Sequence, residues 1–207
     1  MGWGHMVNLV ALPVSEGGEG EGGGETRKYL VDVGFGANGP VVPIPLVSGV
    51  EIPSPIGTTR FKLEYKALEQ HTDRSQRMWV YSYRESDEKE WLDAYAFTEL
   101  EFFAEDYEVM SLATSTLRQS FFVQSLFCVR MVLDTEQGGK GGPVGWLVLH
   151  GDKVTRRIGA TTEVLEELKT EGQRVVALQR WFGIQLSEAE KCGIVDLPTE
   201  IRGWKLG

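Results

Sequence analysis

A histidine and an aspartate stand at matching places on two apolar segments near the start of the chain. His5 opens the run "HMVNLVALPV" (5–14), and Asp32 lies within "KYLVDVGFG" (28–36). Val, Leu and Tyr favour strands, and the Gly- and Glu-rich stretch 15–27 predicts an exposed hairpin loop because it has no apolar side chain to bury. The midpoint of positions 5 and 32 falls between residues 18 and 19, inside this loop. Antiparallel pairing in that register would place the two side chains opposite each other, with Cβ atoms roughly 4.5–5.5 Å apart.

Such a pair can do chemistry. A carboxylate beside an imidazole fixes the histidine tautomer and stabilises the imidazolium, as the third member of a catalytic triad does. The spacing therefore predicts a hydrogen bond between His5 and Asp32, and one interpretation of the pair is that it serves a nucleophile. The alternative is a structural pair, in which the two side chains only hydrogen-bond each other.

The two cysteines are poor candidates for that nucleophile. Cys128 lies in the largely apolar run "SFFVQSLFCVRMVL" (120–133), which predicts a buried strand and an inert core thiol. Cys192 lies in a polar context near a possible helix end. His71 and His150 lack the spacing of metal ligands, and we expect no metal.

Composition restricts the class of protein. The 207 residues are 42% hydrophobic and 25% charged, as in globular domains, and the formal net charge is −9. A nucleic-acid or anionic-membrane surface needs clustered Lys and Arg, so we expect neither partner. No apolar stretch is long enough to span a membrane, no signal pattern opens the chain, and two cysteines make no disulfide framework. We expect a cytoplasmic protein.

The elements that must position His5 and Asp32 are mostly strands. Residues 1–104 show strand patterns with Pro- and Gly-rich punctuation, which predicts an antiparallel β-barrel. The helical character of 98–110 predicts a linker between domains, and residues 105–207 predict this linker helix and a smaller α/β lid domain. The lid domain has a helix at about 171–182 that Thr170 caps and Gly183 ends. Strands followed by helices, without βαβ alternation, indicate an α+β fold.

Several motifs carry a resemblance to one family. "VDVGFG", then "PVVPIPL", then "DYEVM", "TST" and "SFF" within residues 97–130, and finally "LQRWFGIQL" (178–186) resemble the arylamine N-acetyltransferases over nearly the whole chain. The resemblance implies the second and third domains of that fold. It also implies ping-pong acyl transfer through a Cys–His–Asp triad, from acetyl-CoA or another acyl-CoA to the nitrogen of a small arylamine or hydrazine.

The resemblance also assigns roles to residues. It implies that His5 and Asp32 are the family's catalytic histidine and aspartate, and that Phe35 shapes the amine site. Gly2 matches a glycine near the pantetheine of CoA. Thr116 and Ser120 fall in the segment that the family uses against CoA, although Arg118 replaces the proline of that loop.

One departure from the family is large. The nucleophilic cysteine of the family lies in an "Arg-Gly-Gly-x-Cys" segment on an N-terminal helical domain, and this sequence contains no such segment. The resemblance thus implies two thirds of a triad. We expect self-association through the apolar face that the missing domain would cover. The alternatives are a non-catalytic homologue that binds CoA or a partner chain, and a papain-superfamily or transglutaminase-like hydrolase.

Overall fold

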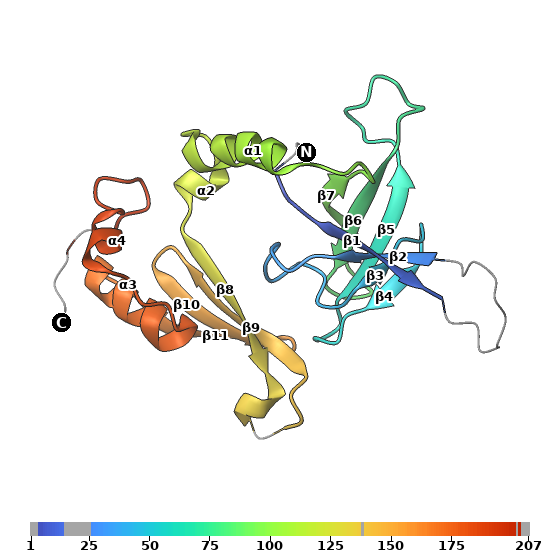
Figure 1. Cartoon of the computed structure of the whole chain (residues 1–207). Coiled ribbons are helices and arrows are strands. Elements are labelled where there is room, and N and C mark those ends of the chain that lie inside the picture. The colour runs from blue at the N-terminus through green and yellow to red at the C-terminus, as the bar shows by residue number, and fades with distance from the viewer. Residues whose placement is uncertain (1–3, 15–25, 138, 202, 204–207) are drawn as a thin grey trace. The chain divides into compact units, whose positions relative to one another are not determined.

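The chain folds into two compact units, Met1–Glu101 and Phe102–Gly207. The structure is a computed structural model, which describes residues 4–14, 26–137, 139–201 and 203 (Figure 1). The division between the units lies close to the expected domain boundary at 104. The described part of the chain contains no helix with the length and hydropathy of a membrane span.

The first unit consists of two antiparallel sheets. One has the strand order β1 (Asn8–Pro13), β2 (Thr26–Val31) and β3 (Ile44–Pro45). The other has the order β4 (Glu51–Pro53), β5 (Arg60–Lys66), β6 (Met78–Arg84) and β7 (Leu92–Phe97).

The expected barrel is wrong, because the two sheets do not close on each other. Among the described residues, their only link by sheet-type pairing is one isolated bridge between Ser48, just after β3, and Leu63 of β5. The physical reason lies in the segment that would have to complete the barrel. Pro43, Pro45 and Pro53 occupy β3, β4 and the approach to them, and proline has no N–H to donate to a ladder. The strands there are consequently two and three residues long.

The core of the first unit is formed by buried side chains from both sheets. Leu30 and Ile44 come from the first sheet and pack with aromatic and aliphatic side chains of the second. The buried members of this cluster are Leu30, Ile44, Phe61, Leu63, Trp79, Tyr81, Tyr95 and Phe97. The position of the end of β2, and of the residues that follow it, is therefore fixed by packing on β5, β6 and β7.

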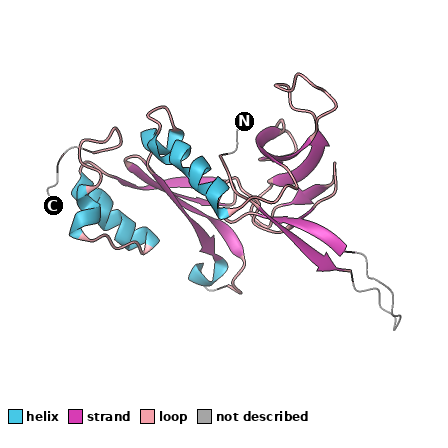
Figure 2. Ribbon diagram, turned by 45° about the horizontal axis from the view of Figure 1, so that its top comes forward, coloured by secondary structure: helices cyan, strands magenta, loops and turns pink. Residues whose placement is uncertain are grey.

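The second unit combines helices with one antiparallel sheet (Figure 2). It begins with α1 (Ala104–Thr116) and α2 (Phe121–Gln124). The sheet has the order β11 (Thr161–Glu167), β10 (Lys153–Ile158), β9 (Pro143–His150) and β8 (Phe127–Leu133). A short 3-10 turn, Asp134–Gln137, follows β8. After the sheet come α3 (Glu171–Ala177), a π-helical continuation (Leu178–Phe182) and α4 (Glu188–Cys192).

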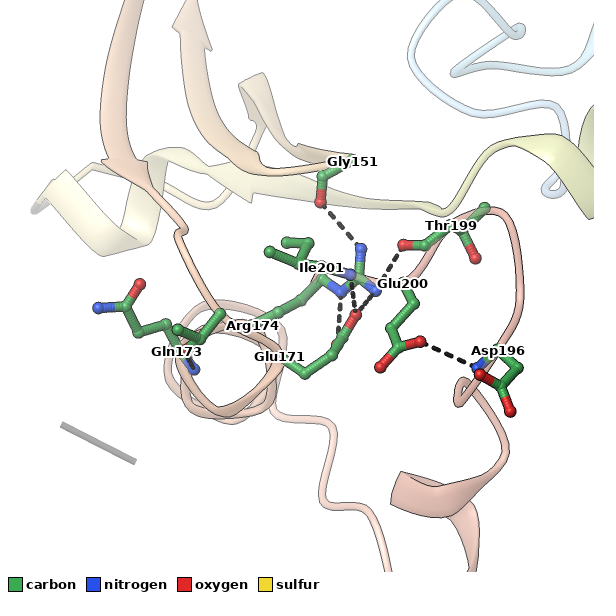
Figure 3. A network of polar contacts seen from close by, with 9 residues as sticks. Gly151, Glu171, Gln173, Arg174, Asp196, Thr199, Glu200 and Ile201 are labelled. Carbon is green, nitrogen blue, oxygen red and sulfur yellow. Dashed lines mark hydrogen bonds and ion pairs between the residues drawn. The ribbon is translucent and has the colours of Figure 1, made fainter. Parts of the chain in front are cut away.

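A buried ion pair fastens α3 to its neighbours in the second unit (Figure 3). Arg174 and Glu171, 1% and 2% exposed, face each other on α3. The Arg174 guanidinium also donates to the carbonyl oxygens of Gly151 and Thr199, at 3.2 and 2.9 Å, and Glu171 accepts from the amide of Ile201 at 2.9 Å. One buried pair thus joins the turn between β9 and β10, α3 and the C-terminal segment. The α+β class is confirmed.

Candidate active site

His5 and Asp32 lie just outside the paired strands of the first sheet. β1 begins at Asn8, after His5, and β2 ends at Val31, immediately before Asp32. The register pairs Asn8 with Val31, and continuing it would place Gly34, not Asp32, opposite His5. The expected register is therefore wrong by two residues. A Cβ at Gly34 would lie 3.8 Å from Cε1 of His5, so Gly34 is beside the His5 ring, but it is the side chain of Asp32 that bonds to it.

The predicted hydrogen bond is confirmed. Nε2 of His5 lies 2.8 Å from Oδ2 of Asp32. The Asp32 side chain is fully buried, whereas the His5 side chain is 23% exposed. The other ring nitrogen of His5, Nδ1, has no hydrogen-bond partner among the described residues. A buried carboxylate therefore holds Nε2, whereas Nδ1 makes no hydrogen bond within the described ranges.

The second carboxylate oxygen of Asp32 is held by the chain that follows it. Oδ1 accepts hydrogen bonds from the amides of Gly34, at 3.0 Å, and Phe35, at 3.2 Å. Burial alone would raise the pKa of Asp32, but the hydrogen bonds from His5 and from the Gly34 amide outweigh it, and the pKa lies below its ordinary value. Asp32 is thus an anion near neutral pH, as a carboxylate that supports an imidazolium must be.

Tyr95 of β7 is the third group against Asp32. Its ring lies 4.9 Å from that of His5 between centroids. Its hydroxyl is buried and has no partner at normal hydrogen-bond geometry among the described residues, but its interaction with Asp32 contributes to lowering the pKa of the carboxyl. Burial, together with the charge of Asp32, raises the pKa of Tyr95, so the phenol stays protonated. Sequence reasoning missed Tyr95, and its only signal was the alternation "DAYAF" of a half-buried strand.

Phe35 contacts His5. The two rings meet edge to face with centroids 5.3 Å apart, and Phe35 is partly exposed. Tyr95 and Tyr81 contact its other sides, at 5.1 and 6.4 Å. The proposed part of Phe35 in binding an amine stays a prediction.

The residues expected to bind CoA are not brought to His5 within one unit. Gly2 lies outside the described residues. Thr116 and Ser120 lie in the second unit, where the hydroxyl of Thr116 donates to the carbonyl of Leu112 and that of Ser120 to the carbonyl of Thr114, each at 2.5 Å. Both hydroxyl protons are thus committed to main-chain acceptors, and a role toward CoA stays a prediction.

The cysteines also lie in the second unit. Cys128 is half-buried in β8, and burial raises the pKa of its thiol, which opposes formation of the nucleophilic thiolate. Cys192 is exposed at the last position of α4. No group of three or more His, Cys, Asp or Glu side chains suited to a metal ion occurs within the described ranges.

Comparison with known proteins identifies the class to which this fold and site belong. The family model described as N-acetyltransferase matches residues 21–191. The chain belongs to this family. Solved structures of similar fold include arylamine N-acetyltransferases.

The curated relatives are more particular. The chain is 37% identical over 209 residues to the N-malonyltransferase FDB2 of Fusarium pseudograminearum (strain CS3096), and 36% identical over 208 residues to that of Gibberella moniliformis. Each alignment covers 97% of this chain but 55% of the relative. The chain therefore spans about half the length of the curated relatives it matches.

Solved structures share the fold. The arylamine-N-acetyltransferase of M. tuberculosis matches with a TM-score of 0.62 at 22% identity, over 94% of this chain and 69% of that one. The M. marinum arylamine N-acetyltransferase in complex with CoA matches with a TM-score of 0.57 at 23% identity, over 87% and 63%. The enzyme from Salmonella typhimurium matches with a TM-score of 0.63 at 18% identity, over 91% and 67%.

Proposed function

We propose that this chain supplies the histidine and aspartate of a Cys–His–Asp site that transfers an acyl group from an acyl-CoA to an amine nitrogen. The observation that carries the proposal is the bond between Nε2 of His5 and Oδ2 of Asp32, which leaves Nδ1 without a partner among the described residues. An imidazole held in this way by a buried carboxylate is suited to take a proton at Nδ1 and to carry the resulting positive charge.

The proposed reaction has two halves. His5 Nδ1 takes the proton of a thiol, and the thiolate attacks the thioester carbonyl of the acyl-CoA. The bond to the CoA sulfur breaks, and the CoA thiolate leaves with the proton that His5 held. In the second half the amine attacks the acyl-enzyme carbonyl, its proton passes to His5, and the enzyme thiolate leaves and is reprotonated.

The nucleophilic thiol in this proposal lies outside these 207 residues. Neither Cys128 nor Cys192 lies in an Arg-Gly-Gly-x-Cys segment, and burial opposes ionisation of Cys128. The relatives have almost twice the length that the chain spans. We propose that the cysteine lies in a segment that corresponds to the part of the relatives outside the alignment.

We propose malonyl as the acyl group and a small arylamine or hydrazine as the acceptor. The curated relatives at 36–37% identity are named N-malonyltransferases, which favours malonyl over the acetyl group named in the family description. Acetyl-CoA is the second donor to test.

The decisive experiment joins this chain to the part of the Fusarium relative that it does not span. The fusion is given malonyl-CoA or acetyl-CoA with an arylamine or a hydrazine, and free CoA and product mass are followed together. We expect amine-dependent CoA release that is faster with malonyl-CoA. The change His5→Gln should lower the rate by about 100-fold or more, as loss of a general base does.

The matched control is His150→Gln, which alters an exposed histidine of the second unit. It should leave the rate unchanged. Equal rates for the fusion with and without His5 would disprove the proposal. Binding of CoA without transfer, in a fusion that carries the cysteine, would favour the non-catalytic alternative.

A further inference from the structure

The segment between Asp32 and β3 contacts both Asp32 and His5, although it lies outside the strands. The amides of Gly34 and Phe35 bind Oδ1 of Asp32, and the ring of Phe35 contacts His5. Yet β2 has ended at Val31, and β3 begins only at Ile44. Interactions other than the hydrogen bonds between paired strands must therefore fix this turn relative to His5.

Asn38 forms hydrogen bonds to one strand through both its main chain and its side chain. Its main-chain carbonyl accepts a hydrogen bond from the hydroxyl of Tyr81 at 2.9 Å, and its side-chain Nδ2 donates to the hydroxyl of Tyr83 at 3.0 Å. Tyr81 and Tyr83 are two residues apart on β6, so their side chains leave the strand on the same face.

The two tyrosines that hold Asn38 belong to the core of the first unit or pack against it. Tyr81 is fully buried in the core cluster, and Tyr83 packs against that cluster. Burial raises the pKa of Tyr81, so its hydroxyl keeps the proton that it donates. The turn is also closed locally, because Gly39 donates to the carbonyl of Gly36 at 2.9 Å. A Cβ at Gly39 would lie 3.0 Å from Cβ of Phe35, so the turn is packed against the residue that contacts His5.

We propose that Asn38 is a positioning residue, whose two-point attachment to Tyr81 and Tyr83 holds the turn 33–39 so that Asp32 keeps both its amide donors and its bond to His5. This rests on the proposed function only in that a positioned Asp32 serves acyl transfer. Its test needs no turnover, so it can fail or succeed independently of that function.

The test is the titration of Asp32 in the 207-residue chain. The chain is labelled with ¹³C at the aspartate Cγ atoms and kept at a concentration where it is monomeric. The Asp32 signal is the one that Asp32→Asn removes. Asn38→Ala deletes the donor, and Tyr83→Phe deletes its acceptor with little change in volume.

Each of these two changes should raise the pKa of Asp32 by about 0.5–1 unit, because the amides that favour the carboxylate are no longer held against it. If the effect passes through the bond between Asn38 and Tyr83, the double variant should shift no further than either single one. The amide signals of Gly34 and Phe35 should lose protection from exchange in parallel.

Two controls separate positioning from general loosening. Asn8→Ala removes an exposed asparagine of β1, and Tyr65→Phe removes a hydroxyl of β5 that has no hydrogen bond in the described part of the chain. Neither should move the titration of Asp32. The proposal is overturned if folded Tyr83→Phe titrates like the parent chain, or if the controls shift Asp32 equally. Should Asn38→Ala fail to fold, Tyr83→Phe alone decides.

Discussion

At the scale of single residues, the ionisation of Asp32 links the site to stability. Its pKa is lower in the folded chain than its ordinary value of 3.8. A carboxyl of this kind stabilises the folded state above its unfolded pKa, and that contribution is lost as the pH falls through the folded pKa. Part of the acid sensitivity of the first unit should therefore come from this one group.

We predict that Asp32→Asn lowers the free energy of unfolding at pH 7 by about 1.5–3 kcal/mol, the contribution typical of hydrogen bonds to a charged group. The difference between parent and variant should shrink as the pH falls below about 4, because the parent loses its carboxylate there. Urea titrations between pH 7 and pH 3 measure both effects.

The control for this prediction is Glu101→Gln, an exposed carboxyl without an ion pair or hydrogen bond among the described residues. A difference between parent and Asp32→Asn that stays constant with pH would contradict the linkage.

Residue types and spacing were sufficient to predict that His5 meets Asp32, because both lie at the ends of one hairpin, but they gave a register that is wrong by two residues. They were insufficient for Tyr95 and Asn38. Tyr95 of β7 contacts His5, and Asn38, in the turn after β2, bonds to Tyr83 of β6. No local pattern in a single sequence encodes which distant strand will lie against a turn.

At the scale of elements, the segment 171–182 shows how far local signals extend. The predicted cap and stop are both present, since Thr170 accepts from the amide of Gln173 and Gly183 has a positive φ of 71°. The helix between them changes from α to π at Leu178, which capping residues do not predict. The run 120–133 was expected to be all strand, but its first part is α2. Short apolar runs do not distinguish helix from strand by periodicity.

The buried pair on α3 gives the prediction at this scale. Arg174→Met should lower the free energy of unfolding by about 3–5 kcal/mol, because it leaves the buried Glu171 carboxylate without its partner. The combined change Glu171→Leu and Arg174→Met should cost less than Arg174→Met alone, since no unpaired charge remains buried. Urea unfolding of the three variants is the measurement.

Arg180→Met is the matched control, because Arg180 lies on the same helical segment and pairs with Glu166 while 65% of its side chain is exposed. It should cost less than about 1 kcal/mol. If Arg174→Met lowered the free energy of unfolding no more than Arg180→Met does, the hydrogen bonds from Arg174 to Gly151 and Thr199 would not stabilise the fold.

At the scale of the whole molecule, the α1–α2 region of the second unit exposes several large apolar side chains. No residue of α1 is buried, and three exposed Phe rings of α2 and β8 contact one another. We call this the α1–α2 surface; its exposed apolar residues are Phe103, Val109, Leu112, Leu117, Phe121, Phe122 and Phe127. Contiguous exposed patches beyond roughly a few hundred Å² are typical of interfaces.

We predict that the chain self-associates through the α1–α2 surface. The sedimentation coefficient should rise with concentration, and the combined change Val109→Ser and Phe122→Ser should reduce that rise. Val164→Ser removes a similarly exposed apolar side chain from β11, far along the chain, and should leave it unaltered. A parent chain that sediments as a monomer at every concentration would contradict the prediction.

The last prediction concerns the acyl-transfer activity of this chain when no thiol beyond Cys128 and Cys192 is supplied. We expect no amine-dependent release of CoA from malonyl-CoA or acetyl-CoA by the chain alone, because His5 and Asp32 can take and return a proton but form no acyl-enzyme, and loss of a nucleophile leaves only positioning. Intact-protein mass after incubation should show no acyl adduct. The opposite outcome is equally informative. A stable adduct on Cys128 or Cys192 that disappears when amine is added, and that Cys128→Ser or Cys192→Ser abolishes, would place the nucleophile within this chain and make the two units partners in one site.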